Sequence, residues 1–472
     1  MTSPKWKEIK GNSGNDMLDA SFPDCEIVEH KICNQTNADA NNNKFFSIEL
    51  QKCSNGLYRV YTNYGRVDSN EFSGAVGLYG PGTEYEATEF FNKKFKSKCS
   101  KSKGYIEISF VRAKVGSPKS RQRTNMIDES EIPVEKKSLI KEDKPQSKSN
   151  ISLDPITSKL VEQWYRESSR AISNNAAVTI TSDGIETPLG VLTFKQIKTG
   201  REILGEIVEA IKDASIPKIR KLTSDFYTNI PAKLGRKITD EDLINSDILV
   251  QTKIDLLQMM EDALEIGGST YVSDTVNKYI GLGMKSNLLQ QSDKEYQRIE
   301  QWIKQSRGHN HYGTTDTVRN ILSVELNADR NRYNKCSINN ETELFHGSRN
   351  CNILGLCSKG LLIAPPCAPV SGYMFDKGIY LASCATKSIN YSLYSFPGMG
   401  SVDNCFLFVI KAKLGKIKEL QHSDSYASKY CIGPSAKFNS VKGCKGRSLI
   451  HDEYIVYALD QATITHIIEL KR

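Results

Sequence analysis

No stretch of this 472-residue sequence approaches the roughly 18 consecutive apolar residues that a membrane-spanning helix needs. The N-terminus also lacks the apolar core of a signal peptide. The twelve cysteines include no CxxC pair and no Cys/His ligand cluster, so neither a zinc finger nor a disulfide framework is indicated. We therefore expect an intracellular protein with reduced thiols, no membrane partner and no metal.

The charge of the chain is mildly positive overall but unevenly distributed. Its net charge is +8, and the hydrophobic fraction of 39% and charged fraction of 25% are typical of soluble globular proteins of about three domains. Basic residues crowd between Lys93 and Arg123 with almost no acidic ones, which favours binding to phosphates. A solvated helix face followed by a flexible tail is the alternative. The segment Ser117–Arg123 could also serve as a nuclear import signal.

The first third of the chain divides into three segments by composition. Residues 1–27 are polar, and we expect them to be disordered. Residues 28–115 contain short alternating stretches and an amphipathic helix over about 83–98, which predicts a small α+β sheet domain packed by one helix. Residues 116–150 have no apolar periodicity and are predicted to be a basic, polar linker.

The spacing of apolar residues changes twice in the rest of the chain. Residues 151–278 carry apolar stripes at helical spacing, such as Ile197, Leu204 and Ile207, and predict an all-α bundle. Residues 285–472 contain mixed strands with few helices, which predicts an α+β domain built on two packed sheets. That domain has no Gly-rich strand-turn-helix fingerprint, so a Rossmann mode of dinucleotide binding is excluded.

A first candidate binding feature is the pair His346–Gly347, at the end of a short apolar strand. Because glycine has no Cβ, a ligand can approach its backbone closely, and a carboxamide would find one donor and one acceptor there. The ring of His346 can bind a sugar hydroxyl. A structural histidine beside a turn explains the same pair.

A second feature is the strand 378–382 and the helix that we predict after it, with Ser383 as its N-cap. On that helix Ser388 and Tyr391 are three residues apart and share a face. A hydroxyl beside an aromatic ring suits a planar heterocycle that bears an amide, and Tyr380 offers a second ring. Ordinary core packing is the alternative for both tyrosines.

Glu453 is the third feature, because it opens the apolar strand 453–459 on the same face as Ile455 and Tyr457. A carboxylate at such a position is costly unless it is paired or used. Cleavage of an N-glycosidic bond develops an oxocarbenium-like cation. One carboxylate can stabilise that cation, hold a ribose hydroxyl and accept the proton of a nucleophile.

The three features together resemble the catalytic domain of the poly(ADP-ribose) polymerases, the ADP-ribosyltransferases with a His/Tyr/Glu triad. The resemblance is carried by Leu344–Ser348, Ala364–Tyr391 and Asp452–Tyr457, in the same order and with intact spacing. It implies a triad of His346, Tyr380 and Glu453, with Glu453 as the catalytic carboxylate.

The resemblance also implies how NAD⁺ is bound as the substrate. The backbone of Gly347 and the hydroxyl of Ser388 would hold the nicotinamide amide, with Tyr380 and Tyr391 flanking its ring. The adenosine part would contact the side chains of His346, Ser348 and Asn352. The segment Ala364–Phe375 resembles the loop that closes over the donor. Leu362 replaces a frequent arginine, and His451–Asp452 replaces a frequent Tyr-Asn pair.

The N-terminal domain resembles the WGR domain with which DNA-dependent members of this family bind DNA. The motif consists of Asn41–Phe46 and Tyr64–Arg66, with Tyr64 in the place of the defining tryptophan. The resemblance implies that Asn43, Lys44 and Arg66 contact the phosphodiester backbone while Tyr64 stacks on a sugar or base. A solvated turn beside a strand is the alternative.

The helical segment 151–278 resembles the regulatory domain of the same family, which shields the donor site until DNA engages. The sequence is thus identified as a nuclear, DNA-activated ADP-ribosyltransferase that acts at DNA ends or nicks. It would release nicotinamide and modify acceptor proteins, including itself and chromatin proteins, without a metal. A mono-ADP-ribosyltransferase and an inactive DNA- or NAD-binding scaffold remain alternatives.

Overall fold

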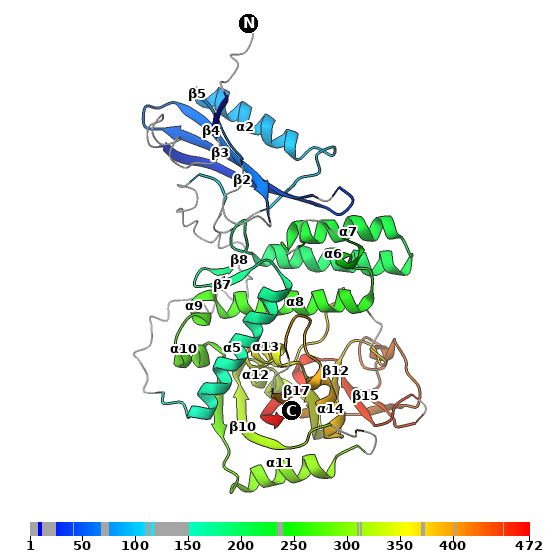
Figure 1. Cartoon of the computed structure of the whole chain (residues 1–472). Helices are drawn as coiled ribbons and strands as arrows, with labels where there is room; N and C mark the ends of the chain where they lie inside the picture. The colour runs from blue at the N-terminus through cyan, green and yellow to red at the C-terminus, as the bar shows by residue number, and fades with distance from the viewer. Residues whose placement is uncertain are drawn as a thin grey trace. The chain divides into compact units, whose positions relative to one another are not determined.

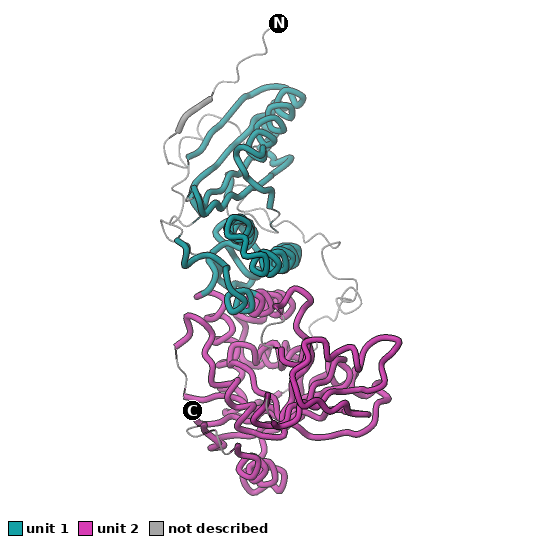
Figure 2. The backbone as a smooth tube through the Cα atoms, turned by 90° about the vertical axis from the view of Figure 1, so that its right-hand side faces the viewer, with its two compact units in different colours: residues 1–144, 175–253 teal, residues 145–174, 254–472 magenta. Residues whose placement is uncertain are grey.

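A computed structural model describes most of the chain, in two compact units (Figures 1 and 2). One unit comprises residues 1–144 and 175–253, and the other comprises residues 145–174 and 254–472. The described residues are 8–11, 25–40, 42–67, 75–108, 110, 115–117, 151–232, 234, 239–308, 311, 314–369, 373–400, 403–446 and 448–472. Most of the predicted linker and import signal lies outside them. In the described part, no helix is both long and apolar enough to cross a membrane.

The first unit contains a six-stranded antiparallel sheet with the order β1-β5-β4-β3-β2-β6. Its strands are β1 (Glu8–Gly11), β2 (Cys25–Asn37), β3 (Asn42–Cys53), β4 (Tyr58–Arg66), β5 (Ala75–Gly82) and β6 (Ile106–Glu107). The expectation of disorder over 1–27 is wrong for residues 8–11, because β1 pairs in register with β5. The alternating pattern of Tyr105–Phe110 predicts a longer last strand than β6, which pairs with β2 through Ile106 and Glu107 in the described part of this segment.

The helix α2 (Glu84–Lys98) packs on this sheet where the amphipathic pattern predicts it. Thr83 begins it with a capping box: the Thr83 hydroxyl accepts from the Glu86 backbone, and Glu86 accepts from the Thr83 backbone. Phe91 on α2 is fully buried against Phe46 and Ile48 of β3. This apolar contact is what holds the helix to the sheet.

The regulatory segment is helical, as predicted, apart from one small hairpin. The first unit holds α6 (Phe194–Lys212), α7 (Ile216–Asn229), the 3-10 turn η2 (Asp240–Asp242) and the hairpin of β7 (Thr179–Thr181) and β8 (Gly184–Glu186). The second unit holds α5 (Pro155–Asn175), α9 (Gly268–Tyr271) and α10 (Thr275–Gly281). α8 (Asp247–Ile266) contributes residues to both units. The apolar stripe of α6 is buried, with Ile197, Leu204 and Ile207 at 0% exposure.

The C-terminal part is built on two sheets, which confirms the predicted α+β class. The five-stranded sheet has the order β11-β13-β17-β10-β9, and the four-stranded sheet has the order β12-β16-β15-β14. The first comprises β9 (Met284–Leu288), β10 (Val318–Leu326), β11 (Glu341–Gly347), β13 (Asn404–Lys413) and β17 (Ala462–Lys471). The second comprises β12 (Ile379–Leu381), β14 (Ile417–Leu420), β15 (Ser440–Gly443) and β16 (Glu453–Val456).

Short helices cover these sheets and shape the loops between them. They are α11 (Lys294–Gln305), α12 (Asn327–Lys335), α13 (Ile353–Lys359), α14 (Ala385–Leu393) and the 3-10 turns η3 (Asn350–Asn352), η4 (Ala427–Tyr430) and η5 (Leu459–Gln461). The core between α11, α14 and the five-stranded sheet contains Ile299, Phe345 and Ile389, all fully buried. All twelve cysteines lie among the described residues, and each carries a thiol rather than a disulfide.

Candidate active site

The strand β11 delivers His346 and Gly347 to the meeting point of the two sheets. Phe345 and Ala382 exchange two backbone hydrogen bonds of 2.8 and 2.9 Å, which join β11 to the end of β12. Gly347 then lies against α14 so closely that a Cβ on it would overlap the Ser388 carbonyl oxygen. The structure therefore brings Gly347 and Ser388 together, and only glycine permits this approach.

The helix that carries Ser388 begins one residue later than the sequence predicts. Its N-cap residue is Cys384, not Ser383, and Cys384 makes no side-chain capping bond. The Ala385 backbone N–H is instead satisfied by the Ser306 hydroxyl, at 3.3 Å. Because this partner comes from a distant segment, the local sequence did not reveal it. Ser388 is buried, whereas Tyr391 on the same helix is 55% exposed.

His346 and Tyr380 are in direct contact across the site. His346 Nδ1 lies 3.0 Å from the Tyr380 carbonyl oxygen. Since a carbonyl can only accept, we assign the proton to Nδ1, which leaves Nε2 as an acceptor for a ligand hydroxyl. Burial lowers the pKa of His346, although the bond to the Tyr380 carbonyl opposes that effect. The imidazole is therefore neutral at physiological pH.

The hydroxyl of Tyr380 is fixed by the loop that precedes β12. It donates to the Asp376 carbonyl at 2.7 Å and accepts from the Phe375 N–H at 2.9 Å. Burial raises the pKa of Tyr380, so the hydroxyl stays protonated. Tyr457 secures the same loop by donating to the Phe375 carbonyl at 2.6 Å. Both tyrosines thus hold the orientation of the loop, beyond the stacking role that the sequence suggests for Tyr380.

Glu453 is buried, with 6% exposure. Because burying an unpaired carboxylate costs free energy, it needs a partner, and it pairs with Lys387. Its Oε1 lies 2.9 Å from Lys387 Nζ, which also donates to the His451 carbonyl at 3.1 Å. Glu453 opens β16, which pairs with β12 so that Tyr380 lies opposite Ile455. The strand ends at Val456, so the prediction that it runs to Leu459 is wrong, since residues 459–461 form η5.

Lys387 was not predicted as a site residue. Its position directly before Ser388, on the same predicted helix, could have indicated a place beside the site. Arg349 and Asp255, which lie beside the site, were missed as well. Arg349 follows Ser348 directly, and its Nη1 lies 2.8 Å from Asp255 Oδ2 on α8. Asn352, predicted on the adenosine side, donates from Nδ2 to the Ser348 hydroxyl at 3.2 Å. Ser348, Arg349 and Asn352 thus form one turn beside α8.

The segment predicted to close over the donor is described except for residues 370–372. Lys377 Nζ donates to the Pro366 carbonyl at 2.7 Å and so ties the proline-containing part of the loop to the chain before β12. Leu362, which replaces a frequent arginine, is 40% exposed at the start of this loop. An apolar side chain there offers no hydrogen bond to a ligand.

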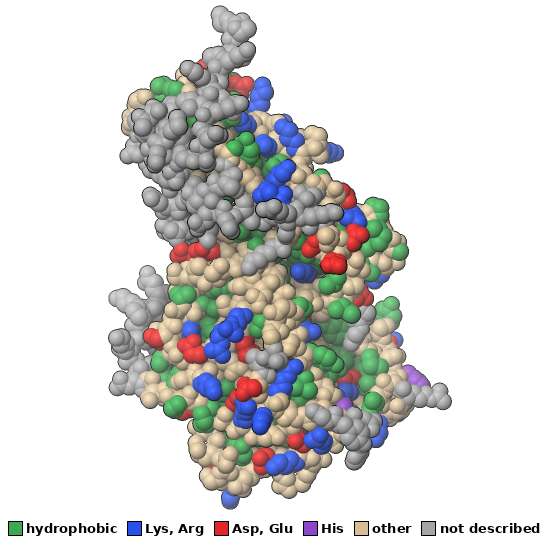
Figure 3. Space-filling model, in the orientation of Figure 1, with side chains coloured by type: hydrophobic (Ala, Val, Ile, Leu, Met, Phe, Trp, Pro, Cys, Tyr) green, Lys and Arg blue, Asp and Glu red, His purple; other side chains and the backbone are tan. Residues whose placement is uncertain are grey.

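In the N-terminal domain, the predicted DNA-binding residues lie on the paired strands β3 and β4. Lys44 is opposite Arg66, and Phe46 is opposite Tyr64. The Tyr64 ring is 46% exposed, and Lys98 Nζ of α2 lies 5.4 Å from its centroid. Lys98 was not predicted as a site residue. Lys and Arg side chains gather over α2 in the space-filling view (Figure 3). The exposed ring of Tyr64 thus lies among the cationic side chains of Lys44, Arg66 and Lys98.

Asn43, which the sequence predicts to contact DNA, is buried in the sheet. Asn43 is 2% exposed, and its Oδ1 accepts from the Thr36 hydroxyl at 3.3 Å within the sheet. A side chain buried in this way is not available to a phosphate. Alternation along the strand places Asn43 and Lys44 on opposite faces, but which face is buried depends on the register with β4 and is not visible in the local sequence.

Comparisons with known proteins bear on the whole chain. Residues 293–434 match the poly(ADP-ribose) polymerase catalytic domain. Residues 152–278 match the regulatory domain of poly(ADP-ribose) polymerase, and residues 30–111 match the WGR domain. The chain belongs to the poly(ADP-ribose) polymerase family. It is therefore an NAD⁺ ADP-ribosyltransferase, and this family uses NAD⁺ as its substrate.

Individual relatives cover most of this transferase. "Poly [ADP-ribose] polymerase 2" of Arabidopsis thaliana is 28% identical over 94% of the chain and 73% of its own length. The human protein of the same name is 27% identical over 97% of the chain and 80% of its own length. "Poly [ADP-ribose] polymerase 1" of Xenopus laevis is 30% identical but aligns with 63% of the chain and 32% of its own length. The three domains of this transferase thus occur in the order WGR, regulatory and catalytic.

Proposed function

We propose that this transferase is activated by DNA ends or nicks in the nucleus and builds poly(ADP-ribose) on acceptor proteins, including itself and chromatin proteins. One combined observation carries the proposal. Glu453 is buried and paired with Lys387, and in the same site Gly347 lies directly against Ser388. A scaffold that only binds NAD⁺ would not need to bury and pair a carboxylate at this point, given the cost of its desolvation.

On this proposal the Gly347 backbone and the Ser388 hydroxyl hold the nicotinamide amide, with the rings of Tyr380 and Tyr391 on either side. The adenosine part contacts His346 through Nε2, together with the Ser348 and Asn352 turn. Three observations support this assignment: the closeness of Gly347 to α14, the Nδ1 proton of His346 and the bond between Asn352 and Ser348. The side chains are held by bonds to their own scaffold, so that little ordering remains for the ligand to bring about.

In the reaction, the bond between the nicotinamide nitrogen and the ribose carbon breaks, and its electron pair leaves with nicotinamide. The Glu453 carboxylate stabilises the cationic ribose and accepts the proton of the acceptor nucleophile, which forms the new bond to the same carbon. Lys387 positions this carboxylate through the 2.9 Å ion pair. A chain extends when the nucleophile is a ribose hydroxyl of ADP-ribose already attached.

The regulatory helix α8 supplies the contact that we propose to restrain the donor site. Asp255 pairs with Arg349, next to Ser348, and Lys359 at the end of α13 pairs with Asp262 at 2.6 Å and with Glu265 at 3.1 Å. These ion pairs hold α8 against the turn that binds adenosine in our proposal. Release of α8 would therefore free the turn for NAD⁺.

DNA binding would reach the regulatory helices through β2. Asn34 Nδ2 donates to the Thr228 carbonyl of α7 at 3.0 Å, and the Thr36 N–H donates to the Thr228 hydroxyl at 2.8 Å. The Ala38 N–H donates to the Ser224 hydroxyl at 3.0 Å. Thus three hydrogen bonds join the end of β2, on the sheet that carries Tyr64 and Arg66, to α7.

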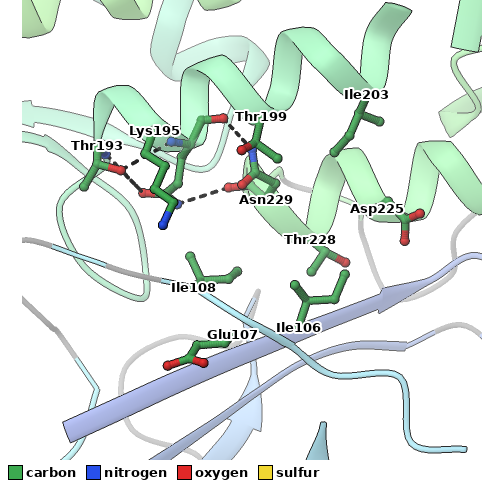
Figure 4. A pocket seen from close by; sticks show the side chains of 11 residues that line it. Ile106, Glu107, Ile108, Thr193, Lys195, Thr199, Ile203, Asp225, Thr228 and Asn229 are labelled. Atoms are coloured by element: carbon green, nitrogen blue, oxygen red, sulfur yellow. Dashed lines mark hydrogen bonds between the residues drawn. The ribbon is translucent and has the colours of Figure 1, made fainter. Parts of the chain in front are cut away.

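A cavity of about 150 Å³ lies beside these bonds (Figure 4). It is lined by the segment Ile106–Ile108 on one side and by Thr193, Lys195 and Asn229 of the α6 and α7 region on the other. The hydrogen bonds of Thr228 and Ser224 cross the junction beside this pocket. Such a junction can respond to a small shift of β2.

The proposal is tested by NAD⁺ consumption of the full chain with and without a short 5′-phosphorylated DNA duplex, with the products sized on a gel. DNA-dependent consumption and a ladder of products would support it. A single shifted band would instead assign mono-ADP-ribosylation, for which the departure at His451–Asp452 beside Glu453 is the specific observation. Unchanged NAD⁺ under both conditions would contradict transferase activity altogether.

A further inference from the structure

Two histidines and one cysteine from three separate segments gather beside the active site. They are His311 before β10, Cys384 at the start of α14 and His451 before β16, and one nitrogen or sulfur atom of each lies within 4.8 Å of the others. No Cys/His cluster is visible in the sequence, because the three residues are far apart in the chain and share no motif spacing. Only the meeting of β16, α14 and the loop before β10 brings them together.

Gly308 packs directly against both histidines of this group. A Cβ on Gly308 would lie 2.6 Å from His451 Nε2 and 2.7 Å from His311 Nδ1, so any larger residue at this position would displace both rings. The Gly308 N–H donates to the Thr386 hydroxyl at 2.8 Å, which anchors the loop to α14. A glycine at position 308 thus allows His311 and His451 to approach the Cys384 thiol.

The chemistry of this set suits one metal in particular. Imidazole nitrogen and thiolate sulfur are the usual ligands of Zn²⁺, and three protein ligands leave a fourth position for water. The Thr386 hydroxyl lies 2.7 Å from His311 Nδ1 and 3.4 Å from Cys384 Sγ, so it contacts two of the three residues. We propose that His311, Cys384 and His451 bind a Zn²⁺ ion. A zinc–sulfur bond then forms, and the thiol proton of Cys384 goes to solvent.

Occupancy of this site would act on Glu453 through Lys387. Tetrahedral zinc holds its ligands about 2.0 to 2.3 Å from the metal and hence roughly 3.3 to 3.8 Å apart. The cluster must therefore contract, and His451 moves with it. Because Lys387 Nζ binds the His451 carbonyl and the Glu453 carboxylate, this movement displaces the catalytic ion pair. Small displacements of a catalytic group lower the rate, so Zn²⁺ is an inhibitor of this transferase. This second step rests on the proposed role of Glu453.

Binding is measured without reference to activity by titrating the metal-free full chain with Co²⁺. The wild type is expected to bind one ion per chain with a thiolate-to-cobalt charge-transfer band and the intense visible bands of tetrahedral cobalt, both removed by Zn²⁺. Cys384→Ser is expected to lose the charge-transfer band. Gly308→Ala, whose Cβ would displace both histidine rings, is expected to bind at least about tenfold more weakly. Cys431→Ser and His422→Gln are matched controls outside the cluster and should bind as the wild type does.

A charge-transfer band that is absent in the wild type, or that persists in Cys384→Ser, would overturn the site. The activity arm compares DNA-stimulated NAD⁺ consumption with and without Zn²⁺ in each variant. Zn²⁺ should inhibit the wild type and both controls but not Cys384→Ser. If zinc binds and the rate does not change, the inhibitory role is wrong. If no variant consumes NAD⁺ under any condition, the proposed function fails, whereas the absorption result still decides the metal site.

Discussion

The Asp255 carboxylate on α8 lies 2.8 Å from the Arg349 guanidinium, one residue beyond the predicted adenosine contact Ser348. This ion pair joins a regulatory helix to a turn of the donor site. Such a contact can be broken without leaving an apolar surface exposed, because water can solvate both partners. Activation would then cost far less free energy than unfolding a helix from the core.

Asp255→Asn is expected to raise the DNA-independent activity of the enzyme. The side chains of Asp255 and Arg349 are 21% and 32% exposed, so the lost charge pair is worth about 1 kcal/mol, or roughly fivefold in the population of the open state. The measurement is the initial rate of NAD⁺ consumption without DNA. Glu209→Gln, which removes the exposed ion pair with Lys212 on α6, is the control and should leave the rate unchanged. A basal rate equal to that of the wild type would argue against α8 as a restraint.

Gly347→Ala should abolish the binding of NAD⁺ and of nicotinamide analogues. The added Cβ would overlap the Ser388 carbonyl, so α14 must move away from β11, at a cost of about 1 to 3 kcal/mol in stability. Thermal unfolding and isothermal titration with a nicotinamide analogue measure the two effects separately. Gly400→Ala is the matched control, since a Cβ there meets nothing within 4 Å. Retained analogue affinity in Gly347→Ala would place the nicotinamide elsewhere.

Glu453→Gln should lower the rate of chain elongation by about 10² to 10⁴ while NAD⁺ still binds. The amide keeps the shape of the carboxylate but can neither accept a proton nor balance the charge of Lys387. Elongation rate and NAD⁺ affinity are measured on the same preparation. Glu419→Gln changes a 63%-exposed carboxylate of strand β14 in the same sheet and should retain full activity. Wild-type elongation by Glu453→Gln would remove Glu453 from the mechanism.

Tyr64→Trp is expected to strengthen binding to DNA ends. A larger ring adds stacking area at an exposed position, and the cation of Lys98 above it favours an indole over a phenol. An increase of about two- to fivefold in affinity, measured by fluorescence anisotropy at fixed salt, would fit this view. Tyr85→Trp alters a 76%-exposed ring on α2 and serves as the control. Equal gains in both variants would point to a non-specific effect of tryptophan.

Thr228→Val should weaken the stimulation of activity by DNA without weakening DNA binding itself. The substitution leaves the Thr36 N–H without its acceptor in a buried junction, a loss of roughly 1 to 3 kcal/mol. The ratio of rates with and without DNA is compared with the dissociation constant for DNA. Thr252→Val, which removes a hydroxyl bonded only to its own helix carbonyl Ile248, is the matched control. A normal rate ratio in Thr228→Val would move the coupling away from β2 and α7.

Local patterns in the sequence determined the elements and the three-domain order. The capping box at Thr83 and Glu86 is a local signal, and the helix it predicts is present. The apolar stripe of α6 and the strands β10, β13 and β17 are likewise set by periodicity, since each depends on residues close in the chain. The motifs around His346, Ser388 and Glu453 identified the family because their order and spacing are properties of the sequence alone.

Contacts between distant segments were decided only by the tertiary structure. Ser306 takes the place of a local N-cap for α14, and the sheet register turns Asn43 into the interior. Lys387 meets Glu453, and Asp255 meets Arg349, across separations that no spacing rule connects. His311, Cys384 and His451 become neighbours for the same reason. Composition and periodicity report what a residue does within its own element, whereas these pairings depend on how the elements pack against one another.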